Sequence, residues 1–352
     1  MTLFEKLLGI PKPVIDMLLS PTSSFSLYSL AFALLLAFVF LAFRQKRRRG
    51  RVRLRAIARA IFTRRVFFHR STYADFAYFF IGVMTLGALL GWVVLSASTI
   101  SDFVAGRLRD HLGARAPLEA PDFALRAGMT IVLFLSYELG FFLDHNLKHR
   151  IPALWELHKT HHSAEVLTPL TNFRVHPLDS LMLVNVLAIV IGLFSGLTQY
   201  LVGKPVETFA FDGTNIFMLV YIYLAVHLQH SQIWIPATGA LGRLLMSPAH
   251  HQIHHSSDPA HYNRNMGASL AVWDWLFGTL EIPQKEPPRM KFGILETDHD
   301  PHSVTALLLS PVTNALGALL GSKPAAVPTT VGAAEKSAPG AVVGRETLTA
   351  GS

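Results

Sequence analysis

The sequence predicts an all-α protein: a multi-pass membrane helical bundle with a histidine-rich helical cap on the cytoplasmic side. Of its 352 residues, 51% are hydrophobic and only 15% are charged, whereas about 25% of residues are charged in a soluble domain. Several uncharged runs are each about as long as a bilayer crossing. Fifteen of the 17 histidines lie at or after position 145. The composition therefore excludes an ordinary soluble protein, and the histidines predict a localised site.

The net charge of +8 comes from one short segment. Residues 44–70 hold twelve Lys and Arg and no Asp or Glu. A basic segment directly after an apolar run marks the cytoplasmic end of a membrane helix, and in a cleaved signal peptide it would precede that run. We therefore expect a multi-pass integral membrane protein, as in a bacterial inner membrane, with no nucleic-acid partner. The absence of cysteine excludes disulfides, iron–sulfur clusters and thiolate-bound metals.

Five apolar runs predict membrane spans, because a crossing takes about 20 mainly apolar residues. A polar connection is expected between the second and third. With residues 44–70 in the cytoplasm, the spans alternate so that the ends of the third and fifth return to the cytoplasmic side. The runs are Phe25–Phe43, Phe76–Ser101, Phe123–Leu143, Ser180–Gly203 and Thr214–Leu228, and the connection covers residues 102–120.

The chain is expected to have four parts. Residues 1–70 comprise the first span and the basic segment, and residues 71–285 a core with four spans and three histidine clusters. Residues 286–322 form an amphipathic segment in which Pro311 interrupts the helical repeat, and which lies along the membrane or covers the site. Residues 323–352, rich in Ala, Pro and Gly, are expected to be disordered.

The histidines form three clusters, two of them with the spacing H-x-x-H-H. Residues three and four positions apart share one face of a helix, so each cluster is expected to present two or three imidazoles together. One ion takes about four to six ligands, so nine imidazoles favour two metal ions. His69, His111, His299 and His302 are expected to face solvent. The nine candidate ligands are His145, His149, His158, His161, His162, His230, His251, His254 and His255.

These clusters and their surroundings resemble the sterol desaturase/fatty acid hydroxylase superfamily over about residues 120–285. The first matching stretch runs from H-N-L-K-H to F-R-V-H-P-L-D. The second contains P-A-H-H-Q-I-H-H-S, N-M-G and W-D-W-L-F-G-T. The resemblance implies a membrane-bound, O2-dependent, non-haem di-iron oxidoreductase that hydroxylates or desaturates a lipid. It assigns the nine histidines as ligands of two iron ions (Fe2+/Fe3+). Candidate residues beside these ligands are Glu138, His176, His227, His250, His261, Asn265 and Asp274.

Several alternatives stay open at this point. Imidazole also suits zinc, copper and nickel, so a zinc-dependent membrane hydrolase using the same cluster is the second interpretation, and a metal-transport or metal-sensing protein the third. The lipid could be a sterol, a hopanoid, a fatty acyl chain or a polar lipid, and the reaction hydroxylation or desaturation. No dinucleotide-binding or cytochrome-like module is recognisable. A separate reductase, ferredoxin or cytochrome-type electron donor is therefore implied.

Overall fold

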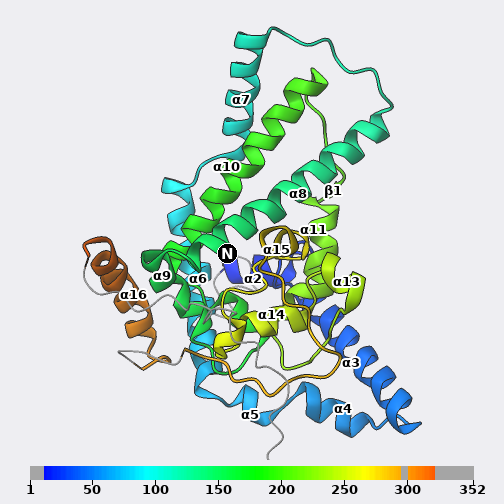
Figure 1. Ribbon diagram of the computed structural model, residues 1–352, viewed down its shortest axis with the longest axis vertical. Coiled ribbons are helices and arrows are strands. Elements are labelled where there is room, and N and C mark those ends of the chain that lie inside the picture. The colour runs from blue at the N-terminus through cyan, green and yellow to red at the C-terminus, as the bar shows by residue number, and fades with distance from the viewer. Residues whose placement is uncertain (1–11, 295–299, 322–352) are drawn as a thin grey trace, which may run out of the picture.

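The computed structural model describes residues 12–294 and 300–321, and helices dominate it (Figure 1). The all-α prediction is confirmed: among the described residues the only regular strands are the two-residue pair β1 (Ala210–Phe211) and β2 (Thr214–Asn215). The predicted tail, residues 323–352, lies outside the described residues, as does His299. The helices up to the second histidine cluster are α2 (Lys12–Leu19), α3 (Leu27–Arg49), α4 (Leu54–Ile61), α5 (Arg64–Phe67), α6 (Arg70–Val93), α7 (Ala97–Leu112), α8 (Asp122–Lys148) and α9 (Pro152–His162).

After the second histidine cluster the chain forms two longer helices, α10 and α16, and a series of short ones between them. Those that carry site residues are separated by irregular segments, which the tertiary contacts hold in place. The helices are η1 (Pro169–Phe173), α10 (Pro177–Val202), α11 (Ile216–Tyr221), η2 (Ile222–Val226, a π-helical turn), α12 (His227–Gln229), α13 (Gly239–Leu244), α14 (Pro248–His254), η3 (Pro259–His261), α15 (Val272–Phe277) and α16 (Val304–Leu319).

Three helices of the described residues are long and apolar enough to cross a membrane: α3, α8 and α10. They correspond to the first, third and fourth predicted spans. The fifth predicted span is helical only from Ile216 to Gln229, which is shorter than the about 20 residues that a crossing needs. The second predicted span is not one helix, because α6 ends at Val93 and α7 begins at Ala97.

Helix α7 also replaces most of the polar connection expected over residues 102–120. It packs along α10, and two glycines of α10 explain how closely. A Cβ on Gly192 would come within 2.7 Å of Ile100 Cβ, and a Cβ on Gly196 within 2.5 Å of Ser101 O. Small residues spaced four apart allow such close backbone approach between membrane helices. Tertiary packing therefore makes this segment helical despite its mixed charges.

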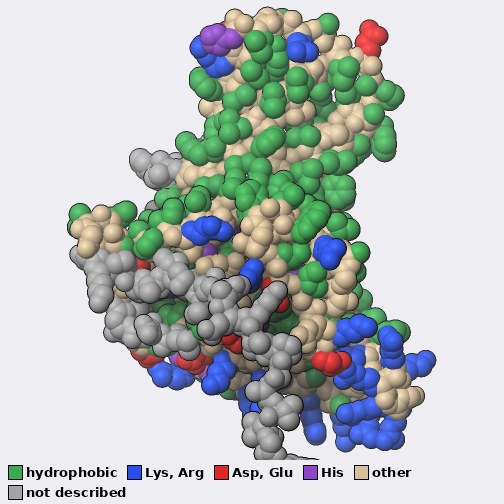
Figure 2. Space-filling view, viewed as in Figure 1, with side chains coloured by type: hydrophobic (Ala, Val, Ile, Leu, Met, Phe, Trp, Pro, Cys, Tyr) green, Lys and Arg blue, Asp and Glu red, His purple; other side chains and the backbone are tan. Residues whose placement is uncertain are grey.

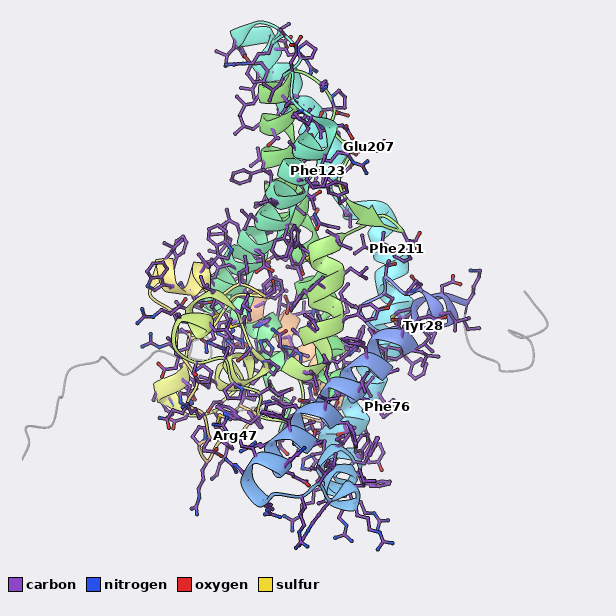
Figure 3. The ribbon with its side chains drawn as sticks, turned by 90° about the vertical axis from the view of Figure 1, so that its right-hand side faces the viewer. Tyr28, Arg47, Phe76, Phe123, Glu207 and Phe211 are labelled. Carbon is purple, nitrogen blue, oxygen red and sulfur yellow. The ribbon has the colours of Figure 1, made fainter. Side chains whose placement is uncertain are left out.

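The surface is divided in the manner expected of a membrane protein. Apolar side chains cover α7, α8 and α10 in Figure 2, with charged groups at the far tip and a dense basic cluster at the opposite end, around α4. Figure 3 places Phe123 and Glu207 toward the first end and Arg47 toward the second. The histidine-bearing helices α9 and α14 lie on the side of the apolar belt nearer the basic end (Figure 1).

Helix α16 packs against α9 and continues through Pro311, where the sequence predicted a break. Proline lacks an N–H and leaves the carbonyl four residues earlier without its helical partner. That carbonyl belongs to Leu307, and the Thr160 hydroxyl of α9 donates to it at 3.5 Å. His176 Nε2 donates to the next carbonyl, Leu308 O, at 3.0 Å. Pro311 thus leaves one acceptor, Leu307 O, for α9, and the contact of His176 with Leu308 O adds a second attachment of α16.

Candidate metal centre

Histidine group 1 brings together five side chains from α8, α9 and α14. Their candidate ligand nitrogens all lie within 4.8 Å of one another, and all five side chains are buried. In each ring Nε2 has no hydrogen-bond partner among the described residues. Because buried polar atoms nearly always have a partner, five gathered lone nitrogens fit a cation. The members of group 1 are His145, His149, His158, His162 and His254.

Histidine group 2 is a second buried set, formed by His161, His230, His251 and His255. The Nε2 atom of His230 lies 2.9 Å from that of His251, 3.1 Å from that of His255 and 3.2 Å from that of His161. Two nitrogens bound to one ion at about 2.0–2.1 Å are about 3–4 Å apart. The distances between these four Nε2 atoms are therefore those expected of nitrogens that bind one metal ion.

The two H-x-x-H-H motifs each contribute to both groups. On α9, His158 and His162 belong to group 1 and His161 belongs to group 2. On α14 and its C-cap, His251 and His255 belong to group 2 and His254 belongs to group 1. The predicted pairs therefore do face together, but the third imidazole of each motif turns toward the other group. The groups touch: the rings of His162 and His255 stack at a centroid distance of 4.7 Å. All nine predicted ligands are thus placed in two adjoining clusters.

Hydrogen bonds to Nδ1 fix three rings of group 1. His145 donates to Met266 O at 2.8 Å, His254 to Arg264 O at 2.8 Å, and His158 to the Asp179 carboxylate at 2.9 Å. Carbonyl and carboxylate oxygens only accept, so Nδ1 carries the proton and Nε2 has the free lone pair. This arrangement is the usual one for histidines that bind a metal through Nε2.

The carbonyls of Arg264 and Met266 come from a loop that three predicted residues hold in place. Glu138, buried on α8, accepts hydrogen bonds from Ser269 N and Leu270 N. Asp274 accepts from Met266 N at 2.7 Å and from Gly267 N at 2.8 Å. Asn265 donates to His250 O at 3.0 Å. These three side chains therefore fix the loop whose carbonyls accept hydrogen bonds from Nδ1 of His145 and His254.

A glycine is required in that loop. A Cβ on Gly267 would meet Leu270 O at 2.5 Å and Asp274 Oδ2 at 2.9 Å. Real Cβ atoms do not approach so closely, so even alanine would displace the backbone between Met266 and Leu270. The N-M-G element of the sequence thus keeps the loop compact enough for Asp274 to hold it.

The remaining predicted neighbours of the ligands have positioning contacts. His176 caps the start of α10 and reaches α16. His250 bonds Ser247 at the start of α14 and Gly242 O. His261 contacts the Ser256 hydroxyl at 2.9 Å, and His227 contacts that of Ser29 at 2.9 Å. All four residues make these contacts to protein groups outside the two histidine groups.

Sequence reasoning missed the charged groups directly behind the ligands. Asp179 holds His158 and also pairs with Lys148, whose ammonium lies 2.6 Å from the Asp144 carboxylate. All three side chains are buried, where unpaired charges would be costly. Asp144 and Lys148 each precede a ligand by one position, and Asp179 ends the F-R-V-H-P-L-D stretch. Charged residues at helix ends look solvated in a sequence, and only their packing reveals this network.

Arg174 of the same stretch is fully buried and joins three parts of the fold. Its guanidinium donates to Thr160 O of α9, to Asp75 of α6 and to Pro301 O before α16. It also contacts His302 Nδ1 at 3.4 Å. His302 is therefore almost covered, not solvent-facing as predicted, because this arginine ties its turn to the core.

A third cluster, His69, Glu165 and His302, has the composition of a metal site, but its hydrogen bonds indicate otherwise. His69 Nδ1 accepts from Ser71 N at 3.2 Å, and His302 Nδ1 faces the donor-only guanidinium of Arg174. Both Nε2 atoms therefore carry protons, and they lie 3.8 and 3.2 Å from the Glu165 carboxylate. Glu165 thus bridges His302 at 3.2 Å and, more loosely, His69 at 3.8 Å, which connects α6 to the turn before α16.

Burial keeps several imidazoles of histidine groups 1 and 2 neutral and ready to bind a cation. It lowers the pKa of His254 to about 3 and that of His230 to about 3, because charged imidazoles lose hydration and repel their neighbours. It lowers the pKa values of His161 and His251 well below the usual range for the same reasons. Metal ligands must be deprotonated, so at neutral pH these rings offer lone pairs without a proton to displace.

Comparison with known proteins identifies the segment that holds these groups. The profile of the fatty acid hydroxylase family matches residues 130–279, which contain all nine histidines. No solved protein structure gives a significant match to the chain.

Curated relatives are lipid-modifying enzymes. The chain is 29% identical to the ornithine lipid hydroxylase OlsE of Rhizobium tropici over 174 residues, 49% of this chain and 48% of that protein. It is 28% identical to human alkylglycerol monooxygenase, covering 44% of this chain and 31% of that protein. It is 29% identical to human cholesterol 25-hydroxylase, covering 47% of this chain and 56% of that protein.

The chain spans about half the length of these relatives, or less. The matched part coincides with the buried histidine groups and the helices that carry them. Residues 130–279 therefore match the fatty acid hydroxylase family, and the resemblance of the chain to the sterol desaturase/fatty acid hydroxylase superfamily is confirmed.

Proposed function

We propose that this protein is a membrane-bound, O2-dependent oxidoreductase that uses two iron ions to hydroxylate or desaturate a lipid. The observation that carries the proposal is the division of nine buried histidines into two adjoining groups. The Nε2 atoms of group 1 have no partner among the described residues, and those of group 2 converge on one another. The relatives named above are hydroxylases and a monooxygenase, which supports redox chemistry over hydrolysis. Zinc has no redox chemistry, so the zinc hydrolase alternative is disfavoured.

The nine histidines would hold the metal ions, five on one and four on the other. Iron, when bound there with O2 and an external electron donor, supplies the oxidising power to remove hydrogen from an unactivated C–H bond. Asp179, Arg264 O and Met266 O keep three imidazoles in the tautomer that presents Nε2. Burial of the whole cluster excludes water, which would otherwise intercept reactive species.

The apolar helices support access for a substrate that is itself a membrane lipid. Helices α3, α8 and α10 have the length and composition of membrane spans, and a bilayer lipid would reach the centre laterally. We place the histidine groups and the basic segment on the cytoplasmic face of a bacterial inner membrane, by the charge rule for membrane helices. A separate reductase, ferredoxin or cytochrome-type protein would supply electrons there.

The deciding experiment compares lipids from cells with and without the gene by mass spectrometry. A hydroxylase adds one oxygen atom to a lipid and a desaturase removes two hydrogen atoms, and either change should require O2. The purified protein should contain about two metal ions per chain. Lipid profiles that are identical with and without the gene, together with O2-independent ester or amide cleavage by the purified protein, would favour the hydrolase instead.

A further inference from the structure

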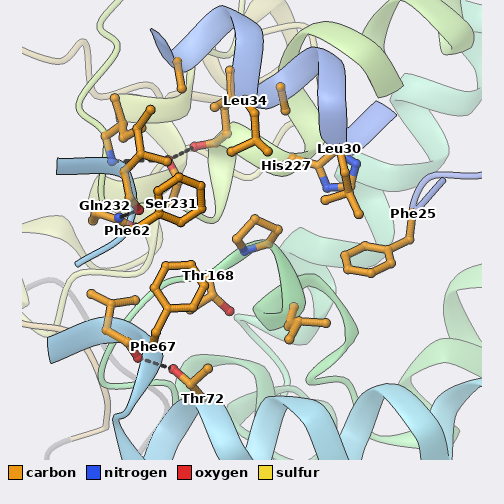
Figure 4. Close-up of a pocket in the computed structure, with 18 of the residues that line it drawn as sticks. Phe25, Leu30, Leu34, Phe62, Phe67, Thr72, Thr168, His227, Ser231 and Gln232 are labelled. Atoms are coloured by element: carbon orange, nitrogen blue, oxygen red, sulfur yellow. Dashed lines mark hydrogen bonds between the residues drawn. The ribbon is translucent and has the colours of Figure 1, made fainter. Parts of the chain in front are cut away.

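An apolar cavity of about 510 Å³ lies beside histidine group 2, between α3, the α4–α5 segment, the start of α6 and η1. Figure 4 shows Phe62 and Phe67 on one side of it and Phe25, Leu30 and His227 on the other. Its volume is within the range of about 300–1,000 Å³ for small-molecule sites. Residues 25–76 supply much of the wall, and these lie outside the segment that matches the family.

The polar groups of the lining leave little for water to bind. The Thr72 hydroxyl donates to Val66 O, the Ser231 hydroxyl to Leu228 O, and the Thr168 hydroxyl to Asp75. His227 Nε2 meets Ser29, while its Nδ1 has no partner among the described residues. A buried water needs about two to four polar partners, and these lining side chains offer one lone nitrogen. The amide of Gln232, an exposed lining residue, donates to Ala60 O and Ile61 O. The cavity is therefore suited to a hydrocarbon occupant.

The cavity shares a wall with the proposed metal centre. Leu228 and Ser231 line it, and His230 stands between them in the chain with its imidazole in histidine group 2. A hydrocarbon chain in the cavity would thus lie behind the same short segment that supplies a candidate ligand. This adjacency connects the cavity to the lipid chemistry proposed above.

Aromatic side chains line the edge of the cavity, and basic residues are their neighbours in the sequence. Phe62 and Phe67 line the cavity and are about half exposed. Exposed arginines adjoin them in sequence: Arg59 on α4, and Arg64 and Arg65 on α5. Helix α4 turns Ile57 inward and arginines outward. Amphipathic basic helices of this kind lie at the membrane surface and attract anionic lipid head groups.

We propose that this cavity binds the acyl chain of an anionic membrane lipid, with its phosphate or carboxylate head group held by Arg59, Arg64 and Arg65. The identification of this lipid as the substrate rests on the proposed function. The binding of the lipid in the cavity is independent of it. The proposal selects a polar acyl lipid over a sterol or hopanoid, because a head group with one hydroxyl would leave the arginines without a counter-charge.

The test uses the full-length protein in phosphatidylcholine nanodiscs containing a trace of photoactivatable lipid, with peptide mapping of the adducts. Probes with the same diazirine-bearing chain and either a phosphatidylglycerol or a phosphatidylcholine head group isolate the effect of charge. The phosphatidylglycerol probe should label Leu30, Leu34 and the segment 61–67, about tenfold more than the phosphatidylcholine probe, because each arginine near the head group favours the anion. Equal labelling by both probes, or stronger labelling by a sterol probe, would refute the proposal.

Two filling variants test the cavity itself. Leu30→Trp and the milder Ala31→Leu, both in the lining, should reduce labelling several-fold. Leu35→Trp, on an exposed position of α3 outside the lining, is the matched control and should label normally. If an inserted, folded filling variant labels as strongly as the control, the cavity is not the site.

A charge variant tests the head-group contact. The triple change Arg59→Gln, Arg64→Gln and Arg65→Gln should abolish the preference for phosphatidylglycerol. The control is the triple change Arg47→Gln, Arg49→Gln and Arg51→Gln, which removes the same number of charges from the same basic segment. This control should keep the preference for phosphatidylglycerol. Loss of the preference in both triple variants would show a general surface effect and would overturn the head-group assignment.

Labelling and turnover separate this inference from the proposed function. His251→Ala removes a candidate ligand and should label like the wild type, since labelling needs no metal. Normal labelling with no oxidised lipid from the wild type would overturn the function and leave the cavity assignment. Leu30→Trp should lose turnover together with labelling; undiminished turnover with lost labelling would show that the bound lipid is not the substrate.

Discussion

Asp179 accepts a hydrogen bond from His158 Nδ1 at 2.9 Å, and this contact turns the Nε2 lone pair of His158 toward histidine group 1. The carboxylate lies at the start of α10 and the imidazole on α9, so the contact also fixes these helices relative to each other. Lys148 neutralises the same carboxylate. One buried acidic group therefore links the fold to the orientation of a candidate ligand.

Replacing this acid should weaken the metal centre without unfolding the protein. Asp179→Asn keeps the shape but no longer stabilises the Nδ1–H tautomer of His158, and loss of such an outer partner typically costs about 10–100-fold in metal affinity or activity. Metal content and lipid turnover of the purified variant measure the effect. Asp258→Asn, at an exposed turn, is the control. Wild-type affinity and turnover in Asp179→Asn would contradict the orienting role.

The two histidine groups should lose their metal at different rates. Three rings of group 1 have Nδ1 partners, whereas the four Nδ1 atoms of group 2 are unpartnered in the described residues. Outer hydrogen bonds strengthen metal binding, so a chelator should remove one ion per chain faster than the other. His161→Ala should eliminate the labile ion and His162→Ala the tight one. A single release phase in the wild type would contradict this assignment.

Loss of a single candidate ligand should abolish turnover. The variants His161→Ala, His162→Ala and His254→Ala should still insert in the membrane, because insertion depends on the apolar helices. The control is His111→Ala, which changes an exposed histidine of α7. Membrane fractionation and lipid analysis are the two measurements. An active His161→Ala or His254→Ala protein would count decisively against a centre built from these residues.

Removing α16 should impair activity, whereas removing the segment after it should not. Truncation after Ile282 deletes the carbonyls of Leu307 and Leu308 that Thr160 and His176 bind. It also uncovers α9. Truncation after Ser322 leaves these contacts, so turnover should stay near wild type. Turnover in membranes with equal amounts of inserted protein gives the comparison, and full activity after truncation at Ile282 would show that α16 is dispensable.

The membrane orientation predicts the same compartment for three sites along the chain. Reporter fusions after residues 60, 170 and 290 should all give a cytoplasmic signal, because the basic segment 44–70 lies at one end of the molecule and both H-x-x-H-H motifs lie nearer that end. Alkaline phosphatase and a fluorescent reporter at each site give opposite readouts. An external signal at any of the three would overturn this orientation.

The metal-free protein should lose stability in acid. Burial lowers the pKa of His230 to about 3 and that of His250 to about 4, while an unfolded histidine titrates near 6.5. Between these values the unfolded chain binds more protons, so the free energy of unfolding falls as the pH drops through about 6.5 toward 4 and is level above about 7. The Tm of the metal-free protein should therefore be lower at pH 5 than at pH 7.5. An equal Tm at both would show that these rings are not buried and neutral.

The sequence by itself determined the helical class, the first, third and fourth apolar spans and the nine clustered histidines. These features are local: a run of apolar residues needs a bilayer, and i, i+4 histidines share a helix face wherever the helix packs. The same local reasoning misjudged residues 102–112, because α7 is stabilised by close packing on Gly192 and Gly196 of α10. It also misjudged Pro311, because the carbonyl that it frees, Leu307 O, finds a partner in Thr160 of α9.

Tertiary structure alone decided which histidines share a group and what holds them. The middle histidine of each H-x-x-H-H motif faces the other group because α9 and α14 present neighbouring faces to both clusters. Asp179 and Met266 O reach their ligands across 21 and 121 positions of the chain. Contacts over such distances follow from how helices pack and not from local periodicity, so the sequence identifies the ligand set while the fold determines its division and orientation.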